Sequence, residues 1–434
     1  MKTIVAISTP IGKGGIGIVR LSGNDSLAIA DKVFTAESFS ISTVKPNYMY
    51  FGYFKGSEFS DKGYMVYFKA PKSFTGEDTV EFQLHGGIRL LDGVVAECVK
   101  YGAVPAERGE FTKRAFLNGK LKLSDAEGVI DMINADSAAA LRAGFRQMQG
   151  YLAKDVGTLE KELINLIAAL EASLDYPEET EDEVLPEIPK IKNEVGEKLK
   201  KLIDTANTGR IIKQGVDVAL IGETNVGKSS LLNRLVGKDR AIVTDIAGTT
   251  RDVIEVATEY DGVKINFIDT AGIRESDDVV EKVGIEKSKA TAKSADVVFN
   301  VIDDSLGATA NCKVNGLVFN VYNKCDKTGR RFGKADGNYY ISAKTGEGID
   351  VLLGDVIKAV KAGDAASGEI ITSKRHLSAL LRAKEAIDAI DLTAPTDCIL
   401  IDLKDALNCL GEITGTSATE EVVDAIFKNF CVGK

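Results

Sequence analysis

The sequence predicts a multidomain protein of α/β and α+β character, in which an α/β domain is inserted into a helical domain that follows an N-terminal α+β domain. Short apolar runs and a helix alternate in residues 1–118, helical periodicity covers 119–210 and returns after 363, and a strand, a glycine-rich loop and a helix occupy 216–236. A domain whose two ends lie close together can be inserted into another domain. We therefore predict a discontinuous helical domain, 119–210 plus 363–434, around an α/β domain at 211–362.

Composition limits the class of protein. The chain has 434 residues, which suits about three domains, and 44% of them are hydrophobic. Its formal net charge of −10 argues against broad, sequence-independent binding of nucleic acid. The six cysteines contain no C-x-x-C pair and there are two histidines, so we expect reduced thiols and no zinc site. The sequence contains neither an apolar run long enough to span a membrane nor a signal peptide, so we expect no membrane contact and a cytoplasmic location.

The N-terminal domain mixes strands with helices. We expect strands at 4–8, 17–21 and 80–84, where aliphatic and β-branched residues cluster. Leucine and valine side chains at helical spacing predict a helix at 86–100.

The helical domain shows the same periodicity on both sides of the insertion. Leu163, Leu166, Ile167 and Leu170 share one helix face, and residues 374–430 are again helical. An acidic stretch bounded by prolines, 175–189, interrupts the first part, and we interpret it as a solvated loop.

The glycine-rich loop fits G-x-x-x-x-G-K-[ST], the phosphate-binding loop of nucleotide hydrolases. It runs from Gly222 to Ser229, after an apolar strand at 216–221 and before a helix. Glycines let backbone N–H groups approach a polyphosphate, and the helix N-terminus adds positive potential. Lys228 would reach the β- and γ-phosphates, and Ser229 would hold Mg²⁺. The strand and helix flanks disfavour the alternative, an ordinary glycine-rich turn.

Three further motifs follow in the order expected of a guanine-nucleotide domain. An acid, Asp269, ends an apolar strand and begins the run D-T-A-G, and N-K-C-D follows the strand 317–322. The carboxylate of Asp326 suits the ring N–H and exocyclic amine of guanine, which adenine cannot offer together. The run S-A-K at 342–344 would support the base. We therefore predict a Ras-like P-loop GTPase domain.

The segment between the first two motifs, T-D-I-A-G-T-T-R-D at 244–252, lies where a loop that senses the γ-phosphate is expected, and Thr250 is its candidate Mg²⁺ hydroxyl. Ile273 stands where Ras-like GTPases place the glutamine that orients the attacking water, so another group must act if hydrolysis is efficient. The amide oxygen of Asn225 could help to hold a monovalent cation. The candidate GTP-binding residues are Asn225, Val226, Gly227, Lys228, Ser229, Ser230, Thr244, Asp245, Ile246, Ala247, Gly248, Thr249, Thr250, Asp269, Thr270, Ala271, Gly272, Asn323, Lys324, Asp326, Ser342, Ala343 and Lys344.

Three separated regions resemble the MnmE (TrmE) family of GTPases, which modify the wobble uridine of certain tRNAs. One region, in the α/β part, carries the two runs T-D-I-A-G-T-T-R-D and D-T-A-G-I-R. The second is the segment S-F-T-G-E-D-T-V-E-F-Q-L-H-G-G at 73–87, and the third is the terminal F-C-V-G-K. The resemblance covers essentially the whole chain. It implies that the N-terminal α+β domain resembles the folate-binding domain of one-carbon enzymes.

The resemblance also implies a second site, for a tetrahydrofolate derivative (5-formyl or methylene). Carried over by motif, its residues are Arg20, Glu81, Lys120 and the terminal Lys434. A carboxylate suits the amino edge of the ring, and cationic groups suit the glutamate tail or the one-carbon oxygen. Cys431 would lie near this site and take part in tRNA modification; its role as a nucleophile or as a general acid or base stays open.

For the reaction, the resemblance implies a homodimer joined through the N-terminal domains and a cycle driven by GTP, Mg²⁺ and K⁺. The implied K⁺ ligands are Asn225, Thr244, the Ile246 carbonyl and Thr249. Glu281 would position the attacking water through a second water, and Arg274 would support the switch region. An FAD-containing MnmG-type partner would form a heterotetramer with the dimer and supply the redox step on tRNA. Together they would add an aminomethyl or carboxymethylaminomethyl group to C5 of the wobble uridine.

Other classes remain open on the residues alone. A ribosome-assembly GTPase would share every nucleotide motif, although it would usually carry a basic RNA-binding domain with a G-x-x-G clamp. A one-carbon transferase with a regulatory GTPase domain is a second alternative. A signalling switch without chemistry is a third, which the Cys431 tail disfavours.

Overall fold

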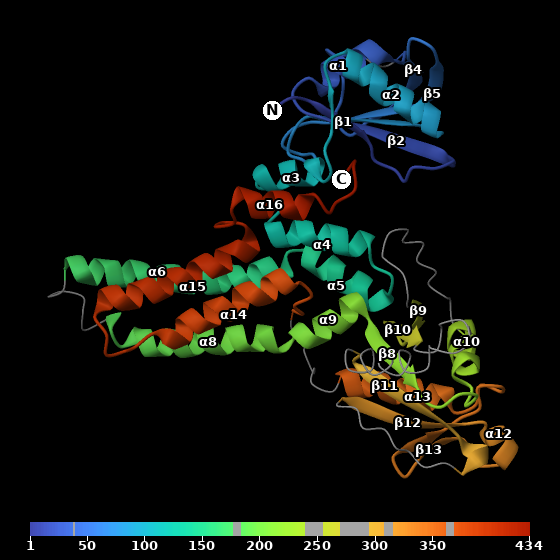
Figure 1. The fold of residues 1–434 in the computed structure, drawn as a ribbon. Coiled ribbons are helices and arrows are strands. Elements are labelled where there is room, and N and C mark those ends of the chain that lie inside the picture. Colours follow the sequence, from blue (N-terminus) through green and yellow to red (C-terminus); the bar gives the residue numbers. More distant parts are fainter. Residues whose placement is uncertain (38–39, 177–183, 239–254, 270–294, 308–315, 362–368) are drawn as a thin grey trace, which may run out of the picture. The chain divides into compact units, whose positions relative to one another are not determined.

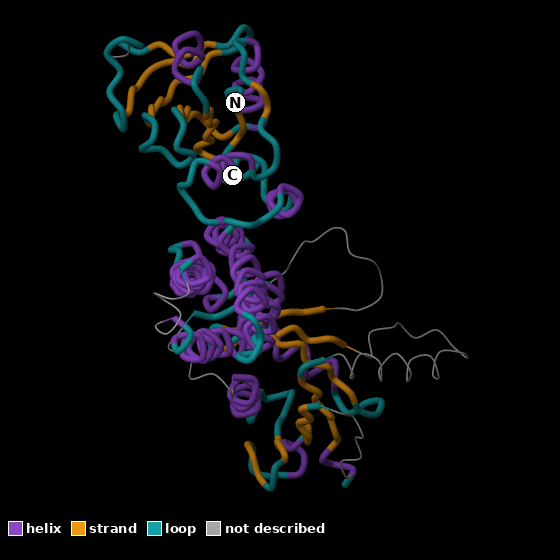
Figure 2. The backbone as a smooth tube through the Cα atoms, turned by 90° about the vertical axis from the view of Figure 1, so that its left-hand side faces the viewer, coloured by secondary structure: helices purple, strands orange, loops and turns teal. Residues whose placement is uncertain are grey.

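The computed structural model describes residues 1–37, 40–176, 184–238, 255–269, 295–307, 316–361 and 369–434. The chain forms two compact units. Unit 1 contains residues 1–130, 147–169 and 404–434, and unit 2 contains 131–146 and 170–403. Figures 1 and 2 show strands near the N-terminus and in the α/β part, while the rest of the described chain is mainly helical. The division into three domains stays a prediction.

The first sheet belongs to unit 1. In the part of the chain that the structure describes, it has seven strands in the order β3-β4-β5-β6-β2-β1-β7. All neighbours are antiparallel except β1 and β7, which are parallel. The strands are β1 Ile4–Ile7, β2 Gly14–Ser22, β3 Phe34–Thr35, β4 Met49–Lys55, β5 Ser60–Phe68, β6 Thr79–Gly86 and β7 Val104–Pro105. The three strands predicted in this region are confirmed.

One face of this sheet carries helices α1 (Ser26–Val33) and α2 (Ile88–Lys100). The predicted helix at 86–100 is therefore confirmed as α2. Inward-facing side chains such as Val19, Phe82 and Leu91 form a buried core beneath the helices. Because side chains alternate along a strand, Arg20 and Glu81 lie on the opposite face.

The β4–β5 turn is attached to α2 through a buried carboxylate. Glu97 accepts hydrogen bonds from the backbone N–H of Ser57 (3.0 Å), from the Ser57 hydroxyl and from Lys100 Nζ (2.7 Å). The hydrogen bonds from Lys100 and Ser57 lower the pKa of Glu97 to about 2. Since this is below the pKa of 4.5 for a free glutamate, ionised Glu97 stabilises the fold above about pH 4.5. The stabilisation is lost as pH falls toward about 2.

Glu97→Gln is therefore expected to lower the free energy of unfolding at pH 7 by about 1–2 kcal/mol, which for a unit of more than about 150 residues is a Tm decrease of about 2–8 °C. The difference in Tm between wild type and variant should be constant above about pH 5 and should become smaller from pH 4.5 downward. Thermal unfolding of the full chain at several pH values measures it. A Tm difference that stays constant down to pH 3 would contradict the assignment.

The helices outside the sheets are distributed over both units. They are α3 Glu110–Leu117, α4 Leu123–Ile133, α5 Ala138–Met148, α6 Tyr151–Asp175, α8 Glu187–Asp204, α9 Ala206–Gln214, α14 Lys374–Ala389, α15 Thr396–Thr414 and α16 Glu420–Phe427. Helix α6 ends at Asp175 and helix α8 begins at Glu187, so the first residue and the last three residues of the stretch 175–189, which we predicted to be a loop, were assigned wrongly. Pro189 is tolerated there because the first helical turn needs no backbone donor. None of the helices in the described ranges has the length and apolarity needed to cross a membrane.

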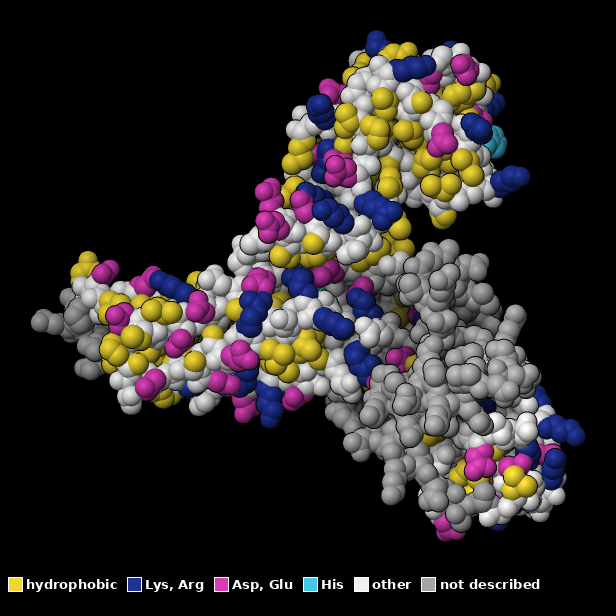
Figure 3. Space-filling model, viewed as in Figure 1, with side chains coloured by type: hydrophobic (Ala, Val, Ile, Leu, Met, Phe, Trp, Pro, Cys, Tyr) yellow, Lys and Arg dark blue, Asp and Glu magenta, His cyan; other side chains and the backbone are white. Residues whose placement is uncertain are grey.

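The charges on these helices are mixed in sign. On the face drawn in Figure 3, Lys and Arg side chains are interspersed with Asp and Glu over the long helices. The described residues on this face therefore form no broad basic surface.

The second sheet belongs to unit 2 and forms the α/β part. Among the described residues it has seven strands in the order β13-β14-β12-β11-β8-β10-β9. They are β8 Val216–Ile221, β9 Glu255–Tyr260, β10 Val263–Asp269, β11 Val297–Asp303, β12 Leu317–Asn323, β13 Gly333–Ala335 and β14 Asn338–Tyr340, with helices α10 Lys228–Lys238, α12 Cys325–Thr328 and α13 Ile349–Lys361. The central strands are parallel. Every residue of β11 is buried, as expected for a strand covered on both faces.

Candidate functional site

The loop after β8 has the backbone geometry of a phosphate-binding loop. Gly222 and Gly227 adopt positive φ angles of 146° and 96°. A Cβ at Gly222 would lie 2.2 Å from the Val301 carbonyl, and one at Gly227 would lie 2.4 Å from Asn323 Nδ2. Both positions therefore require glycine, which explains their place in the motif.

Lys228 folds back over this loop. Its ammonium donates to the carbonyls of Gly222 (2.8 Å) and Glu223 (2.7 Å). Ser229 and Ser230 follow it in the first turn of α10. A cation and hydroxyls at a helix N-terminus suit a polyphosphate and its metal.

Asn323 joins three of the predicted motifs. It is 1% exposed; its Nδ2 donates to the Val226 carbonyl (2.9 Å), and its Oδ1 accepts from the backbone N–H of Ala343 (2.9 Å). The phosphate loop, the N-K-C-D loop and the S-A-K loop are therefore held together by one buried amide. Breaking either bond would leave a buried polar group without its partner.

Asp326 presents its carboxylate at the surface beside the S-A-K loop. The Ser342 hydroxyl donates to Asp326 Oδ1 (2.8 Å) and accepts from the backbone N–H of Thr345 (3.1 Å). Asp326 itself is exposed, and Lys344 is exposed on the neighbouring loop. This arrangement orients a carboxylate toward a ligand without neutralising it, as recognition of paired N–H donors requires.

Two residues that the motifs do not contain support these loops. Arg234, on α10, donates to the carbonyls of Ala343 (3.2 Å) and Lys344. Asp303, at the end of β11, forms an ion pair with Lys324 (2.6 Å), and Lys324 Nζ also donates to the Asn225 carbonyl (2.6 Å). Sequence reasoning missed both residues, because neither the helix nor the strand that carries them marks them by spacing.

Several predicted nucleotide residues fall outside the described residues. They are Thr244, Asp245, Ile246, Ala247, Gly248, Thr249, Thr250, Thr270, Ala271, Gly272, Arg274 and Glu281. Asp269 is the last residue of β10, where its backbone pairs in parallel with Leu220 of β8. The assigned roles of these residues stay predictions.

A second cluster of predicted residues lies in unit 1. Arg20 on β2 and Glu81 on β6 are directly opposite in the antiparallel ladder, and Arg20 Nε donates to Glu81 Oε1 (2.7 Å). The guanidinium lies over the rings of Phe74 (5.9 Å) and Phe111 (5.7 Å). Arg20 is 20% exposed and Glu81 is 13% exposed at the side chain. The pair is therefore ordered but accessible to a small ligand.

Lys120 contacts the loop that carries Phe74. Its Nζ donates to the Pro71 carbonyl (3.0 Å), and a Cβ at Gly76 would lie 3.3 Å from its Cγ. The loop at 70–76 thus contacts both Lys120 and, through Phe74, the guanidinium of Arg20.

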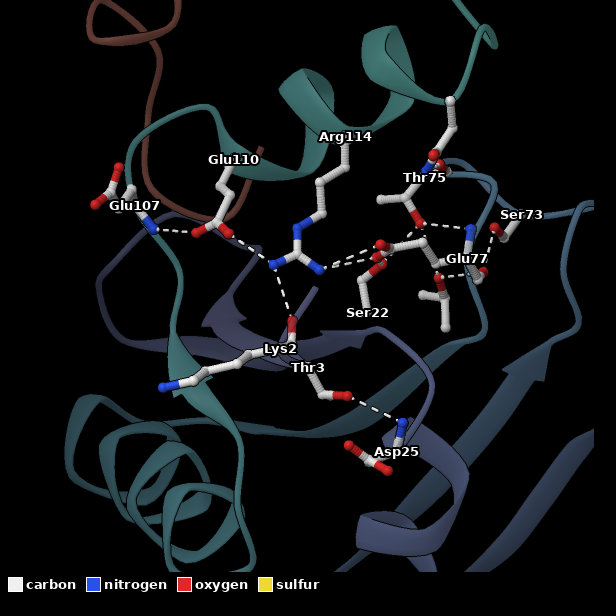
Figure 4. A network of polar contacts seen from close by, with 12 residues as sticks. Lys2, Thr3, Ser22, Asp25, Ser73, Thr75, Glu77, Glu107, Glu110 and Arg114 are labelled. Carbon is white, nitrogen blue, oxygen red and sulfur yellow. Dashed lines mark hydrogen bonds and ion pairs between the residues drawn. The ribbon is translucent and has the colours of Figure 1, made fainter. Parts of the chain in front are cut away.

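A buried arginine holds this loop in place (Figure 4). Arg114, on α3, is 5% exposed; it donates to Glu77 (3.0 Å), to Glu110 (2.8 Å) and to the Lys2 carbonyl (3.0 Å). Glu77 also accepts from the Ser22 hydroxyl (2.7 Å), two residues after Arg20 on the same face of β2. Sequence reasoning missed this network, because its members lie on four separate segments.

The C-terminal tail contacts the end of β1 and the segment that leads into α3. Helix α16 packs on α3, and Phe427 and Phe430 are buried in one cluster with Leu123. Val432 forms an isolated antiparallel β-bridge with Arg108. The Gly433 carbonyl accepts a hydrogen bond from the Ser8 hydroxyl (3.2 Å). The Cys431 carbonyl accepts one from the backbone N–H of Gly109 (3.3 Å). Gly433 has a φ of 91°, and a Cβ there would lie 2.1 Å from the Ile7 carbonyl. Because strand β1 pairs with β2, the tail that carries the exposed Cys431 lies one strand from Arg20.

Family models match most of the chain. Residues 3–120 match a model described as "GTP-binding protein TrmE N-terminus", and residues 123–431 match one described as "MnmE helical domain". Curated proteins named "tRNA modification GTPase MnmE" are similar over the full length. The one from Caldicellulosiruptor saccharolyticus is 39% identical over 100% of this chain and 99% of its own length. The one from Aquifex aeolicus is 40% identical, with 99% of each chain covered.

Solved structures are similar to part of the chain. A single-residue variant of Era from Aquifex aeolicus, bound to GDP and AlF4⁻, is 26% identical, covering 42% of this chain and 69% of its own, with a TM-score of 0.25. The G domain of the FeoB iron transporter of T. maritima is 25% identical, covering 33% of this chain and 97% of its own, with a TM-score of 0.23.

Proposed function

The chain belongs to the MnmE family, and from that premise we propose that it is a tRNA modification GTPase acting on C5 of the wobble uridine. One observation supports a role in tRNA modification in addition to GTP hydrolysis. The tail with Cys431 lies against the end of β1, the strand that pairs with the strand of Arg20, within a chain that also joins the guanine-nucleotide loops. Such a tail disfavours a signalling switch without chemistry.

The nucleotide chemistry rests on positioning and electrostatics. Lys228 neutralises the phosphates and Asp326 selects guanine. Asn323 keeps the phosphate loop and the N-K-C-D loop at a fixed separation. The hydroxyl of Ser229, with that of Thr250, suits Mg²⁺, because hydroxyl oxygen is a hard ligand. When bound, Mg²⁺ would offset charge on the β- and γ-phosphates.

A monovalent cation is the proposed replacement for the missing glutamine. Asn225 adopts a left-handed backbone conformation (φ 62°), which asparagine tolerates, and it is exposed on the phosphate loop. Its amide oxygen, with Thr244, the Ile246 carbonyl and Thr249, would offer a set of neutral oxygens of the kind that K⁺ prefers. The bound cation would stabilise charge that develops during hydrolysis. Glu281 is proposed to position the attacking water, and Arg274 to support the switch region.

Replacing K⁺ by Na⁺ at fixed ionic strength is expected to slow GTP hydrolysis by at least about tenfold, or about 1.4 kcal/mol in the barrier. The larger K⁺ ion suits a site of several neutral oxygens, whereas Na⁺ would fit it poorly. Steady-state phosphate release in KCl and in NaCl measures the effect. Equal rates in the two salts would remove the cation from the mechanism.

The N-terminal site is proposed to bind a reduced folate. Glu81 can accept from the amino edge of the ring, while Arg20, Lys120 and Lys434 suit the glutamate tail or the one-carbon oxygen. The ion pair between Arg20 and Glu81 holds both groups on an accessible face, which supports this assignment. Methylene-tetrahydrofolate would supply the carbon when bound.

The proposed partners follow from the family. We propose a homodimer joined through the N-terminal domains, a heterotetramer with an FAD-dependent MnmG-type protein that supplies the redox step, and tRNA as substrate. Phe51, Tyr53 and Tyr64 are 41–52% exposed on the open face of the N-terminal sheet, which supports a protein contact there. The cytoplasmic location is part of the same proposal.

Nucleoside mass spectrometry of tRNA from cells with and without this chain tests the function. Loss of a 5-aminomethyl-type wobble uridine in its absence, restored by the intact protein, is the expected result. An unchanged nucleoside profile would contradict the proposal and leave a GTPase of another pathway, with ribosome assembly as the leading alternative.

A further inference from the structure

The loop at 70–76, between β5 and β6, is held by polar contacts around Phe74. The side-chain amide of Asn118 donates to the Thr75 carbonyl (2.7 Å). The network drawn in Figure 4 includes both neighbours of Phe74 in the sequence, Ser73 and Thr75. The backbone that carries Phe74 is therefore fixed on both sides.

This loop presents the ring of Phe74 to solvent. Phe74 is 41% exposed, whereas Thr75 beside it is completely buried. A single exposed phenylalanine is common on protein surfaces and implies nothing by itself. What distinguishes Phe74 is the charged group that lies against its ring.

That group is the guanidinium of Arg20, whose Cζ lies 5.9 Å from the centroid of the Phe74 ring. The same guanidinium lies 5.7 Å from the ring of Phe111, which is fully buried, and it donates from Nε to Glu81 (2.7 Å). Phe74 and Glu81 therefore contact one guanidinium, which keeps them close together. Of the two rings, only that of Phe74 is accessible, so it offers an apolar surface near an acceptor carboxylate.

A flat heterocycle with N–H donors along one edge matches this pair of groups. Aromatic rings stack with their centroids about 4.5–7 Å apart, and an ionised carboxylate accepts from two adjacent N–H donors at once. The pterin of a folate has this form, with a flat pyrimidine part and an amino edge. An aliphatic ligand would gain only ordinary apolar contact with the ring of Phe74.

We propose that Phe74 is the side chain on which the pterin ring of the folate stacks, while Glu81 accepts from its amino edge. The polar contacts of the loop hold the ring of Phe74 ready for the ligand. This inference rests on the proposed folate site and deepens it, because it identifies the residue that selects a flat ring.

Phe74→Leu tests the proposal, because leucine keeps an apolar side chain but has no ring. We expect the Kd of 5-formyltetrahydrofolate to rise at least about fivefold in Phe74→Leu and to stay within about twofold of wild type in Phe74→Tyr. Isothermal titration calorimetry on the full chain, without GTP, measures this binding directly.

Phe145→Leu, on α5, is the matched control. It removes a ring that is 50% exposed and belongs to unit 2, so the Kd should be unchanged. Because both rings are exposed, neither leucine variant should change the Tm by more than about 2 °C. Changes in binding can therefore be read without a change in folding.

Phe74→Trp adds a spectroscopic readout that a purely structural role would not affect. The chain contains no tryptophan, so the new indole is its single such fluorophore. Stacking of the pterin on this indole should quench its fluorescence, and the quenching should saturate at the same ligand concentration as the calorimetric signal. Phe145→Trp is the control, and its fluorescence should not change after correction for light that the ligand absorbs.

The possible outcomes separate this inference from the proposed function. If the wild type does not bind 5-formyltetrahydrofolate, the proposed folate site fails and the inference fails with it. If the wild type binds but Phe74→Leu keeps the Kd within about twofold, or Phe74→Trp binds without quenching, the inference alone is wrong. An equal rise of the Kd in Phe145→Leu would also overturn it. So would a weaker homodimer with an unchanged Kd in Phe74→Leu, which would assign Phe74 to a protein contact.

Discussion

Asp326→Asn is expected to change the base preference from GTP to xanthosine triphosphate, with GTP affinity falling by about 10²–10⁴-fold. The carboxylate can accept from the ring N–H and the exocyclic amine of guanine, whereas an amide offers one acceptor and one donor. Xanthine carries a carbonyl where guanine carries the amine, so the donor of the amide finds a partner there.

The structure indicates which way the new amide would point. The Ser342 hydroxyl donates to Asp326 Oδ1, so an asparagine would keep its oxygen on Ser342 and turn its NH₂ group toward the ligand. Competition of GTP and xanthosine triphosphate for the protein, measured by equilibrium binding, tests this. Asp336→Asn, in the exposed β13–β14 turn, is a control that should leave base preference unchanged. Retention of guanine selectivity by the Asp326 variant would remove Asp326 from its assigned role.

Cys431→Ser is expected to reduce tRNA modification at least about 100-fold while GTP turnover stays near normal. A serine hydroxyl is a far weaker nucleophile and acid than a thiol at neutral pH, whereas the change in size is small. The tail is held by its backbone and by Gly433, not by the sulfur, so the substitution should not release it. Two measurements are made on the same variant: the modified nucleosides in tRNA report the modification, and the release of phosphate reports GTP turnover.

Two variants separate a chemical role of the thiol from a structural one. Cys398→Ser changes another exposed cysteine, on α15, and should alter neither reaction. Gly433→Ala keeps Cys431 but forces a Cβ to within 2.1 Å of the Ile7 carbonyl, so the tail should shift and modification should fall. Collapse of GTP turnover in Cys431→Ser would show that the tail is structural.

The phosphate loop was predictable from the sequence because its geometry is local. The strand, the glycine-rich loop and the helix at 216–236 follow one another without interruption, and glycine is required at Gly222 and Gly227 for reasons of backbone geometry. Asp326 and Ser342 were predicted to serve the base and are joined by a hydrogen bond. The predicted loop at 175–189 was too long, because Pro189 within the first turn of a helix looks like a helix breaker in the sequence.

The sequence by itself determined the order of the motifs and the strands and helices that carry them, and its resemblance to the MnmE family led us to predict Arg20 and Glu81 as members of one site. Only the tertiary structure decided which side chains support them: Asn323 between two loops, Arg114 behind the loop at 70–76, and Asp303 on Lys324. The tail contact between Ser8 and Gly433 joins residues 425 positions apart. Local backbone requirements produce recognisable motifs in the sequence. A contact between distant side chains depends on how the helices and strands pack, so no sequence spacing predicts it.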